Sequence, residues 1–279
     1  MAPSIADVVA QDALYHKTRT LLDLLTLKNK VTVLTGAGRG IGLSLARVAA
    51  ELGSDVALLD VLPNPPEDIK ELEERFGIRA KYYQADVTNL PQLTEVVDKI
   101  KTEFGQINNC VSAAGICIDK PFLDHTWDDS VRTVNVNILG SFFIAQLTAK
   151  AMKEQKSGGS IVLVSSSASH IYTTSRCMSI YSASKGAISA LTTNLAVELA
   201  EHDIRVNAIA PGFIATEMVV DQASTDPQLW IDFNEAIPLK RMGRREDLKG
   251  VVALLLSPAS SFITGGEYAV DGGMTCGRK

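Results

Sequence analysis

Short apolar segments rich in β-branched residues alternate with longer amphipathic ones along most of this chain, and this alternation limits the possible folds more than any other feature. Strands that are apolar along their whole length are typical of parallel sheets, in which helices bury both faces. The sequence therefore predicts a series of buried strands. In chain order they occupy Val31–Thr35, Asp55–Asp60, Ala80–Ala85, Asn109–Ala113, Ser160–Ser165, Arg205–Ile209 and Glu267–Val270.

The segments between these strands have the periodicity and length of amphipathic helices. Because parallel strands need crossover connections, we expect helices on both faces of the sheet. We therefore predict an α/β fold in which residues 28–279 form one domain around a doubly wound, seven-stranded, mostly parallel sheet. The expected helices are Ile41–Leu52, Pro66–Phe76, Leu90–Phe104, Trp127–Gln155, Tyr181–His202 and Glu246–Leu256.

Two segments fall outside this regular pattern. Residues 1–27 form an N-terminal leader, and its apolar end at Leu21–Leu27 is expected to pack on the body. Residues 213–238 resemble an insertion that carries Trp230 and Phe233, and two interpretations stay open. The insertion is either a pair of surface helices or a lid over a ligand.

Charge and cysteine content argue against several classes of protein. The net charge is −5 with no block of Lys or Arg, which disfavours nucleic-acid binding. The four cysteines lack paired CxxC spacing, which predicts free thiols in a reducing compartment and no metal site. No apolar run approaches the roughly 20 residues that span a bilayer. Because Asp7 and Asp12 interrupt the N-terminus, it does not resemble a secretory signal, and we expect a cytoplasmic protein without a membrane anchor.

A glycine-rich turn at Thr35–Gly42 directly follows the first predicted strand and opens the first predicted helix. Glycines let the backbone approach a pyrophosphate, and the free N–H groups of the helix N-terminus attract that anion. Asp60 ends the second predicted strand, where a carboxylate can accept hydrogen bonds from the hydroxyls of an adenosine ribose. The turn and Asp60 together predict a dinucleotide site.

Two residues of this site bear on the choice between NAD and NADP. Asp60 would repel a 2′-phosphate and so favours NAD. Arg39 in the turn could pair with that phosphate and would favour NADP. We favour NAD, because a carboxylate at the ribose needs compensation whereas an arginine in a loop can turn away.

Tyr181 and Lys185 are four residues apart in the fifth predicted helix, so their side chains share one face. An adjacent ammonium favours the phenolate, which predicts a phenol pKa below its ordinary value of about 10. Such a tyrosine could exchange a proton with an alcohol or a carbonyl. Such spacing alone usually indicates a surface pair, so a catalytic role for these two residues depends on the rest of the sequence.

With these features together, the chain resembles the short-chain dehydrogenase/reductase family from about Lys28 to Gly273, which implies a Rossmann fold. The pattern continues through segments that follow successive strands. The matching segments are the TGxxxGxG turn, Asp86-Val87, Val136–Phe142, Ile161–Ser166, the YxxxK pair, Arg205–Asn207 and Pro211–Thr216.

The resemblance implies a catalytic set of Asn137, Ser166, Tyr181 and Lys185. Asn135 is an alternative to Asn137, and Ser165 and Ser167 are alternatives to Ser166. The family's roles imply that Asn137 anchors a water in a proton relay and that Ser166 holds the substrate oxygen. The implied cofactor-binding residues are Gly36, Arg39, Gly40, Ile41, Gly42, Asp60, Asp86, Val87, Gly115, Tyr181, Lys185, Pro211, Gly212, Ile214 and Thr216.

The sequence departs from the family pattern at two places. The NNAG motif reads Ser112-Ala113-Ala114-Gly115, for which we expect a local effect on stability and not a loss of catalysis. The loop between Ser166 and Tyr181 is slightly longer than the common form, which alters one wall of the substrate pocket.

The implied reaction is reversible hydride transfer between NAD(H) and a secondary alcohol or its ketone. The 167–180 loop carries many hydroxyl groups, and the chain as a whole resembles polyol and ketose members of the family. Both features suggest that the substrate is a polyol or sugar alcohol and that the product is its ketose. A reductase of a natural-product or acyl ketone is an alternative, and so is an NAD-binding regulator without turnover. A second apolar face on the predicted helices suggests subunit contacts, and the family resemblance implies a homodimer or homotetramer.

Overall fold

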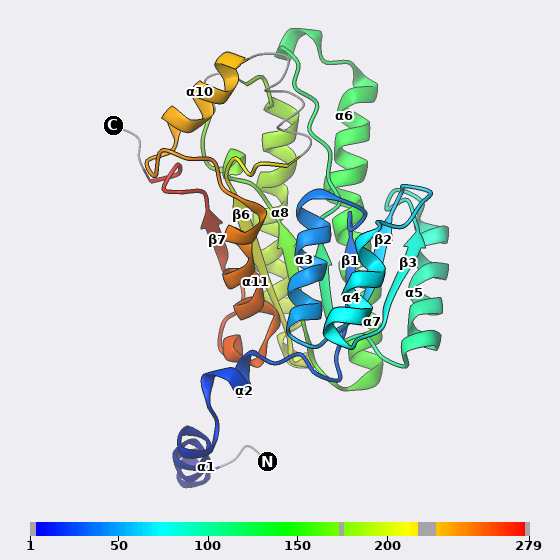
Figure 1. Cartoon of the computed structure of the whole chain (residues 1–279), viewed down its shortest axis with the longest axis vertical. Helices are drawn as coiled ribbons and strands as arrows, with labels where there is room; N and C mark the ends of the chain where they lie inside the picture. Colours follow the sequence, from blue (N-terminus) through cyan, green and yellow to red (C-terminus); the bar gives the residue numbers. More distant parts are fainter. Residues whose placement is uncertain (1–3, 173–175, 217–226, 277–279) are drawn as a thin grey trace.

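The computed structural model of the protein describes residues 4–172, 176–216 and 227–276. Figure 1 shows a central sheet covered by helices. Only part of the predicted insertion at 213–238 is described, because residues 217–226 lie outside the described residues. Thr173, Thr174 and Ser175 of the predicted pocket loop lie outside them as well.

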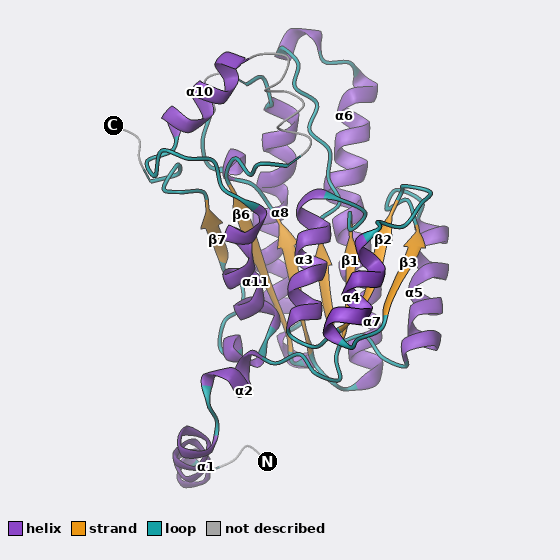
Figure 2. Ribbon diagram, in the orientation of Figure 1, coloured by secondary structure: helices purple, strands orange, loops and turns teal. Residues whose placement is uncertain are grey.

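The sheet has seven strands in the order β3-β2-β1-β4-β5-β6-β7, and every pairing within it is parallel. The prediction of a doubly wound α/β fold is therefore confirmed (Figure 2). The strand order reverses between β1 and β4, and in such folds a crevice opens there beyond the carboxyl ends of the strands. The strands are β1 Val31–Thr35, β2 Asp55–Asp60, β3 Ala80–Gln84, β4 Asn109–Ser112, β5 Gly159–Val164, β6 Ile204–Pro211 and β7 Glu267–Val270.

Two apolar layers bury the sheet, one on each face. Helices α5, α7 and α8 pack on one face through residues such as Ile100, Ile144 and Ile188. Helices α3, α4 and α11 pack on the other through residues such as Leu45 and Leu72. The helices of the body are α3 Gly40–Glu51, α4 Asp68–Phe76, α5 Leu90–Phe104, α6 Trp127–Val134, α7 Gly140–Gln155, α8 Ser179–Glu198, α10 Pro227–Ala236 and α11 Lys249–Leu256.

The single helix predicted over Trp127–Gln155 is interrupted by a π-helical turn at Asn135–Leu139. It joins α6 to α7 without a break in helical direction. A π turn inserts one extra residue into the helical ladder and is often found at functional sites. The amphipathic pattern on either side could not reveal this extra residue, because a change of one residue barely alters the periodicity.

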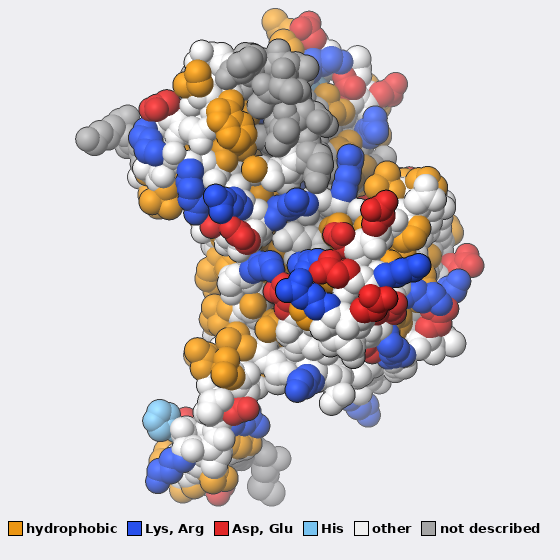
Figure 3. Space-filling model, viewed as in Figure 1, with side chains coloured by type: hydrophobic (Ala, Val, Ile, Leu, Met, Phe, Trp, Pro, Cys, Tyr) orange, Lys and Arg blue, Asp and Glu red, His pale blue; other side chains and the backbone are white. Residues whose placement is uncertain are grey.

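Charged side chains of both signs are interspersed over the face that carries α3, α4 and α11 (Figure 3). Arg47 of α3 pairs with Glu71 of α4, and Lys249 of α11 lies 2.6 Å from Glu51 of α3. These pairs join neighbouring helices on this face, and as surface pairs each contributes about 0–1 kcal/mol.

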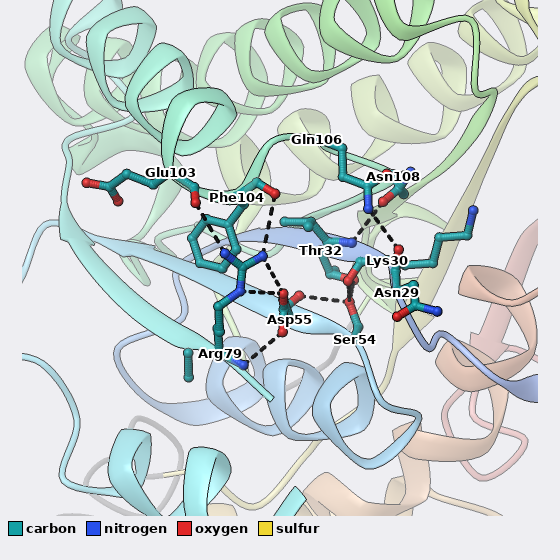
Figure 4. Close-up of polar contacts among 12 residues, drawn as sticks. Asn29, Lys30, Thr32, Ser54, Asp55, Arg79, Glu103, Phe104, Gln106 and Asn108 are labelled. Carbon is teal, nitrogen blue, oxygen red and sulfur yellow. Dashed lines mark hydrogen bonds and ion pairs between the residues drawn. The ribbon is translucent and has the colours of Figure 1, made fainter. Parts of the chain in front are cut away.

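A polar network closes the amino-terminal end of the sheet (Figure 4). Arg79 donates to Asp55 from its backbone N and from Nε, both at 2.8 Å, and its Nη1 donates to the Glu103 carbonyl oxygen at 3.2 Å. Thr32 Oγ1 and Ser54 Oγ are hydrogen-bonded at 2.8 Å. The network connects β1, β2 and the end of α5 and so stabilises the amino-terminal end of the sheet. The crevice lies at the other end, beyond the carboxyl ends of the strands.

The N-terminal leader is helical in two pieces, α1 Ile5–Thr18 and α2 Leu21–Leu25. Leu27 is 1% exposed, and its N–H donates to the Leu52 carbonyl oxygen at 2.8 Å, so the end of the leader packs against the body. Helix α1 has no buried residue and projects away from the domain (Figure 1). Within the described parts of the chain, no helix is long and apolar enough to cross a membrane.

Candidate active site

A cavity of about 490 Å³ lies at the carboxyl ends of the strands, where the strand order reverses. Every residue expected to bind the cofactor lines this cavity, from Gly36 to Thr216. Of the expected catalytic residues, Ser166, Tyr181 and Lys185 line it too. Asn137 is fully buried behind its wall. Residues from segments far apart in the sequence therefore meet in one place, as the parallel topology requires.

The glycine-rich turn has the shape that a pyrophosphate requires. Gly36 has a φ of +65°, and a Cβ there would lie 2.7 Å from backbone atoms of Ala114. A Cβ at Gly42 would lie 2.0 Å from the Gly36 carbonyl oxygen. Arg39 precedes α3 and makes no side-chain cap, so no capping side chain covers the first-turn N–H groups. These groups fit the phosphates of a dinucleotide.

Asp60 ends β2 with its carboxylate fixed at the cavity. One carboxylate oxygen accepts the Gly38 N–H at 2.8 Å, and the other accepts the Leu62 N–H at 3.1 Å. A Cβ at Gly38 would lie 2.9 Å from this carboxylate. The carboxylate is thus held in one orientation beside the turn, as binding of ribose hydroxyls requires. Arg39 also lines the cavity but its side chain is exposed.

Asp86 and Val87 follow β3 and form the next part of the cavity wall. One oxygen of Asp86 accepts both the N–H and the hydroxyl of Thr88, each at 2.8 Å. Val87 packs so closely on Gly140 that a Cβ there would lie 2.6 Å from Val87 Cγ2. The segment is therefore rigid and presents its backbone to the cavity.

The opposite end of the cavity is formed by the end of β6 and the residues after it. A Cβ at Gly212 would lie 2.8 Å from Asp271, so the chain can turn closely there only with glycine. Ile214 is 4% exposed and pairs with Gly243 in an isolated parallel bridge. This bridge fixes the position of Ile214 and Thr216 along the cavity.

Tyr181 and Lys185 lie together in the first turns of α8. The Lys185 side chain is buried, and its Nζ donates to the Val164 carbonyl oxygen at 2.7 Å. Nζ lies 5.7 Å from the centroid of the Tyr181 ring. The pair is therefore not a surface contact, because the lysine is anchored to the end of β5.

The expectation of a lowered phenol pKa is wrong for this structure. Burial raises the pKa of Tyr181 to about 12, because desolvation penalises the phenolate; a hydrogen bond with the Ser166 side chain acts in the opposite direction. Burial also lowers the pKa of Lys185 to about 8. Sequence spacing shows which groups are neighbours, but desolvation depends on burial, which the spacing does not contain.

Asn137 lies within the π-helical turn and connects two walls of the site. Its side chain exchanges two hydrogen bonds with the backbone of Ile116, both at 2.9 Å, and donates a third to Ser184 Oγ at 2.9 Å. Its Oδ1 and the Lys185 Nζ would each lie 3.4 Å from a Cβ at Gly115. The π turn therefore brings Asn137, rather than its neighbour Asn135, close to the lysine.

Of the three candidate serines after β5, Ser165 and Ser167 are buried and Ser166 is only half-buried. Ser165 is 2% exposed, and its hydroxyl donates to the Lys185 carbonyl oxygen at 3.1 Å within the packing of α8. Ser166 is half-buried, and its side chain hydrogen-bonds Tyr181 and accepts the Ala168 N–H at 3.2 Å. The geometry favours Ser166 as the hydroxyl that faces the substrate.

The altered NNAG segment retains a structural hydrogen bond. Ser112 donates to Ser141 Oγ of α7 at 3.0 Å, and the Ala114 N–H donates to Thr35 Oγ1 at 3.3 Å. These bonds connect the end of β4 to α7 and to β1. Serine at position 112 thus keeps a polar connection that the missing amide would otherwise have supplied.

The structure adds Ile116 and Cys117, which sequence reasoning did not assign to the site, and places Arg176 of the expected pocket loop with them. Ile116, Cys117 and Arg176 line the cavity near Tyr181. Burial raises the pKa of the Cys117 thiol to about 11, which makes it a poor nucleophile at neutral pH. Arg176 is 7% exposed and pairs with Asp119. Its position shortly before Tyr181 in the sequence indicated that it could lie near the site. Its pairing could not be predicted, because Asp119 is distant in the sequence.

Comparisons with known proteins agree with this geometry. A family model described as enoyl-(acyl carrier protein) reductase matches residues 36–275. The sorbose reductase SOU1 of Candida albicans is 35% identical over 260 residues, which cover 92% of this chain and 90% of that protein. An L-rhamnose 1-dehydrogenase (NAD(P)(+)) of Sphingomonas is 36% identical and covers 89% of this chain and 97% of its own.

A solved structure is similar over the whole domain. The crystal structure of a short-chain type dehydrogenase/reductase from Mycobacterium marinum matches with a TM-score of 0.86 and 37% identity, covering 92% of this chain and 100% of that one. The fold, the cavity and these relatives define an NAD(P)-dependent oxidoreductase that acts on a CH–OH group. The chain belongs to the short-chain dehydrogenase/reductase family.

Proposed function

We propose that this enzyme reversibly transfers a hydride between NAD(H) and a secondary alcohol, and that the alcohol is a polyol or sugar alcohol with its ketose as the product. The observation that carries the proposal is the placement of Tyr181, Ser166 and Lys185 in one cavity with the dinucleotide turn. The sorbose reductase and the rhamnose dehydrogenase among its relatives support a sugar-type substrate.

We assign the proton transfer to Tyr181 and the polarisation of the substrate oxygen to Ser166. In oxidation the phenolate takes the hydroxyl proton, and in reduction the phenol returns it. The Ser166 hydroxyl holds the oxygen on which negative charge develops. When bound in the cavity, the nicotinamide ring accepts or supplies the hydride.

Lys185 and Asn137 support this proton transfer. Because burial holds the pKa of Lys185 near 8, its amine can gain or lose a proton close to neutral pH. We assign to it the binding of the nicotinamide ribose hydroxyls and the next proton step after Tyr181. Asn137 fixes the wall at Ile116 beside Lys185 and anchors the water that would connect the lysine to solvent.

NAD is the proposed cofactor, with NADP as the weaker substrate. Asp60 is oriented by two backbone N–H groups, so its negative charge cannot easily move away from a 2′-phosphate. Arg39 is exposed and can approach that phosphate, which would permit some use of NADP. Initial rates with each cofactor at the same concentration test this preference.

A reductase of a natural-product or acyl ketone is the second candidate; the family model's description, enoyl-(acyl carrier protein) reductase, shares with it only an acyl-type substrate, because an enoyl reductase acts on a C=C bond. The second candidate would use Trp230 and Phe233 as an apolar platform for a larger ligand. Phe233 is 1% exposed and stacks on Phe213 with ring centroids 4.0 Å apart, so it is occupied within the protein. This packing weakens the second candidate relative to the first.

One experiment separates these functions from an NAD-binding regulator without turnover. The purified protein is mixed with NAD or NADP and a panel of polyols, and with the reduced cofactors and a panel of ketoses and acyl ketones. The absorbance of the reduced cofactor is followed. Turnover of polyols supports the proposal, whereas turnover of acyl ketones alone supports the second candidate. Tight NAD binding with no turnover in any panel supports the regulator.

We further propose a homodimer or homotetramer in the cytoplasm. On α7 and α8, Phe142 is 37% exposed and Val197 is 76% exposed, which provides apolar surface for subunit contacts. All four cysteines are free, as a reducing compartment requires. Light scattering during size-exclusion chromatography tests the proposed assembly.

A further inference from the structure

Arg176 places a buried cation at the substrate end of the cavity. The residue is 7% exposed and lines the cavity together with Ser166 and Tyr181. Other lining residues nearby are apolar, among them Ile116 and Met178. The positive group here is therefore a side-chain guanidinium among apolar residues. In the phosphate-facing part of the cavity, by contrast, backbone N–H groups attract an anion.

Contacts on two sides hold the guanidinium in place. Arg176 Nε forms an ion pair with Asp119 Oδ2, and Asp119 Oδ1 accepts the Cys177 N–H at 2.7 Å. Arg176 Cζ lies 5.8 Å from the centroid of the Phe233 ring, which stacks in turn on Phe213. An arginine that is paired and stacked in this way loses little further freedom when it binds a ligand.

The stability of the fold does not require a positive charge at position 176. A buried ion pair can often be replaced by apolar residues of similar volume without loss of stability, because burial of both charges is costly. The neighbouring cluster of Phe233, Ile237, Met242 and Met274 would accept an apolar side chain. The charge therefore fits better with a role toward a ligand than with packing.

We propose that Arg176 is a specificity-determining residue that donates a hydrogen bond to a substrate hydroxyl on the carbon next to the reacting one. The inference rests on the proposed function and makes it more specific. Ser166 and Tyr181, to which we assign the reacting oxygen, line the same cavity as Arg176. Asp119 compensates the positive charge, so a neutral hydroxyl fits this position better than a carboxylate.

The electrostatic influence of Arg176 on its neighbours supports this placement. Its positive charge lowers the pKa of Tyr181, and it lowers that of Cys117 both as a charge and through a hydrogen bond. Arg176, Cys117 and Tyr181 line the same cavity, so a substrate hydroxyl beside the reacting carbon can lie between the guanidinium and the phenol.

The test compares two substrates with the same carbon skeleton, butane-2,3-diol and butan-2-ol. For the wild type we expect a higher kcat/KM for the diol. Arg176→Met should lower the ratio of kcat/KM for the diol to kcat/KM for butan-2-ol by about 10- to 100-fold, as expected for loss of a charge-assisted hydrogen bond, because any effect on Tyr181 acts on both substrates alike. Arg176→Lys should recover only part of the difference, because an ammonium lacks the planar fork.

Arg241→Met is the matched control. Arg241 forms a two-point pair with Asp247 at 2.7 and 2.9 Å, and it does not line this cavity. The control should leave the diol-to-butanol ratio unchanged. Circular dichroism and NAD affinity of each variant show whether it is folded. An unchanged ratio in folded Arg176→Met overturns the inference, and so does a wild type with no preference for the diol.

A second measurement separates this inference from the proposed function. If the wild type oxidises neither alcohol, the NAD-saturated protein is heated with and without 100 mM butane-2,3-diol. A diol-dependent rise in melting temperature that is lost in Arg176→Met supports the inference even though the proposed activity has failed. No rise in the wild type overturns the inference as well.

Discussion

Lys185 Nζ donates a hydrogen bond to the Val164 carbonyl oxygen at 2.7 Å, which ties the catalytic helix α8 to the last residue of β5. The bond fixes a buried amine behind Tyr181, with Nζ 5.7 Å from the ring centroid. It also satisfies a carbonyl group where the sheet ends and the cavity begins. The position of the amine is therefore set by the sheet and not by the helix alone.

Replacing Lys185 by Met should lower kcat for alcohol oxidation by about 10²- to 10⁴-fold, because we assign to its amine the proton step after Tyr181. Methionine has a similar length and suits the buried position, so the protein should remain folded. Initial rates and melting temperature measure the two effects. Lys249→Met, which removes a surface pair with Glu51, is the control and should keep wild-type rates. Rates within about threefold of wild type for Lys185→Met would contradict this role.

Tyr181→Phe should leave NAD binding nearly intact and abolish turnover. The ring and its packing remain, but the group that exchanges the proton is gone. Fluorescence titration with NAD measures binding, and reduced-cofactor absorbance measures turnover. Tyr268→Phe in β7 serves as the control, because its hydroxyl is not part of this cavity. Surviving turnover in Tyr181→Phe would show that another group moves the proton.

Ser166→Ala should move the pH profile of alcohol oxidation to higher pH. The hydrogen bond from Ser166 lowers the pKa of Tyr181 against the rise to about 12 that burial causes, so its removal raises that pKa further. The basic form of Tyr181 is the active one in oxidation, so activity at a given pH falls. The logarithm of kcat/KM plotted against pH gives the apparent pKa.

Ser165→Ala provides the comparison for this profile. Its hydroxyl bonds the Lys185 carbonyl oxygen within the packing of α8, so its loss should cost about 1 kcal/mol of stability and leave the profile unchanged. If Ser165→Ala moved the profile and Ser166→Ala did not, the assignment of the two serines would have to be exchanged.

The sequence was sufficient for features that depend on local patterns and on parallel topology. The turn at Gly36–Gly42, the carboxylate of Asp60 and the Tyr181–Lys185 pair all line one cavity because parallel strands end at one edge. The approximate ranges of the strands and helices followed from hydrophobic periodicity, which is itself a local pattern. Beyond the reach of local patterns, two kinds of feature were missed or misjudged.

The first kind depends on burial, and the second on contacts between distant segments. The pKa of Tyr181 was expected to fall, yet desolvation raises it, and no sequence pattern states how deeply a phenol is buried. Arg176 was expected only as one residue of the loop that lines the pocket, and its pairing could not be predicted because its partner Asp119 comes from the segment after β4. The π turn around Asn137 was hidden within a continuous helical pattern.

Asp60→Ala should lower the preference for NAD over NADP by about tenfold or more. Removing the carboxylate abolishes hydrogen bonds to the ribose and also the repulsion of a 2′-phosphate. The ratio of kcat/KM for the two cofactors measures this change. Asp68→Ala on α4 is a suitable control, since this residue does not line the cavity. An unchanged ratio in Asp60→Ala would indicate that Arg39 or another group sets the preference.

Gly42→Ala and Gly250→Ala should have opposite effects on stability, although both place a methyl group in a helix. At Gly42 the new Cβ would lie 2.0 Å from the Gly36 carbonyl oxygen, so the turn must shift, with a cost of about 1–3 kcal/mol. NAD affinity should fall with it, because the pyrophosphate cradle is the part that moves.

At Gly250 of α11 no atom lies within 4 Å of the new Cβ, so alanine should stabilise the helix by about 0.5–1 kcal/mol. Urea unfolding of both variants, with and without saturating NAD, measures the two signs. A Gly42→Ala protein that keeps wild-type stability and NAD affinity would show that the turn does not form the cradle described above.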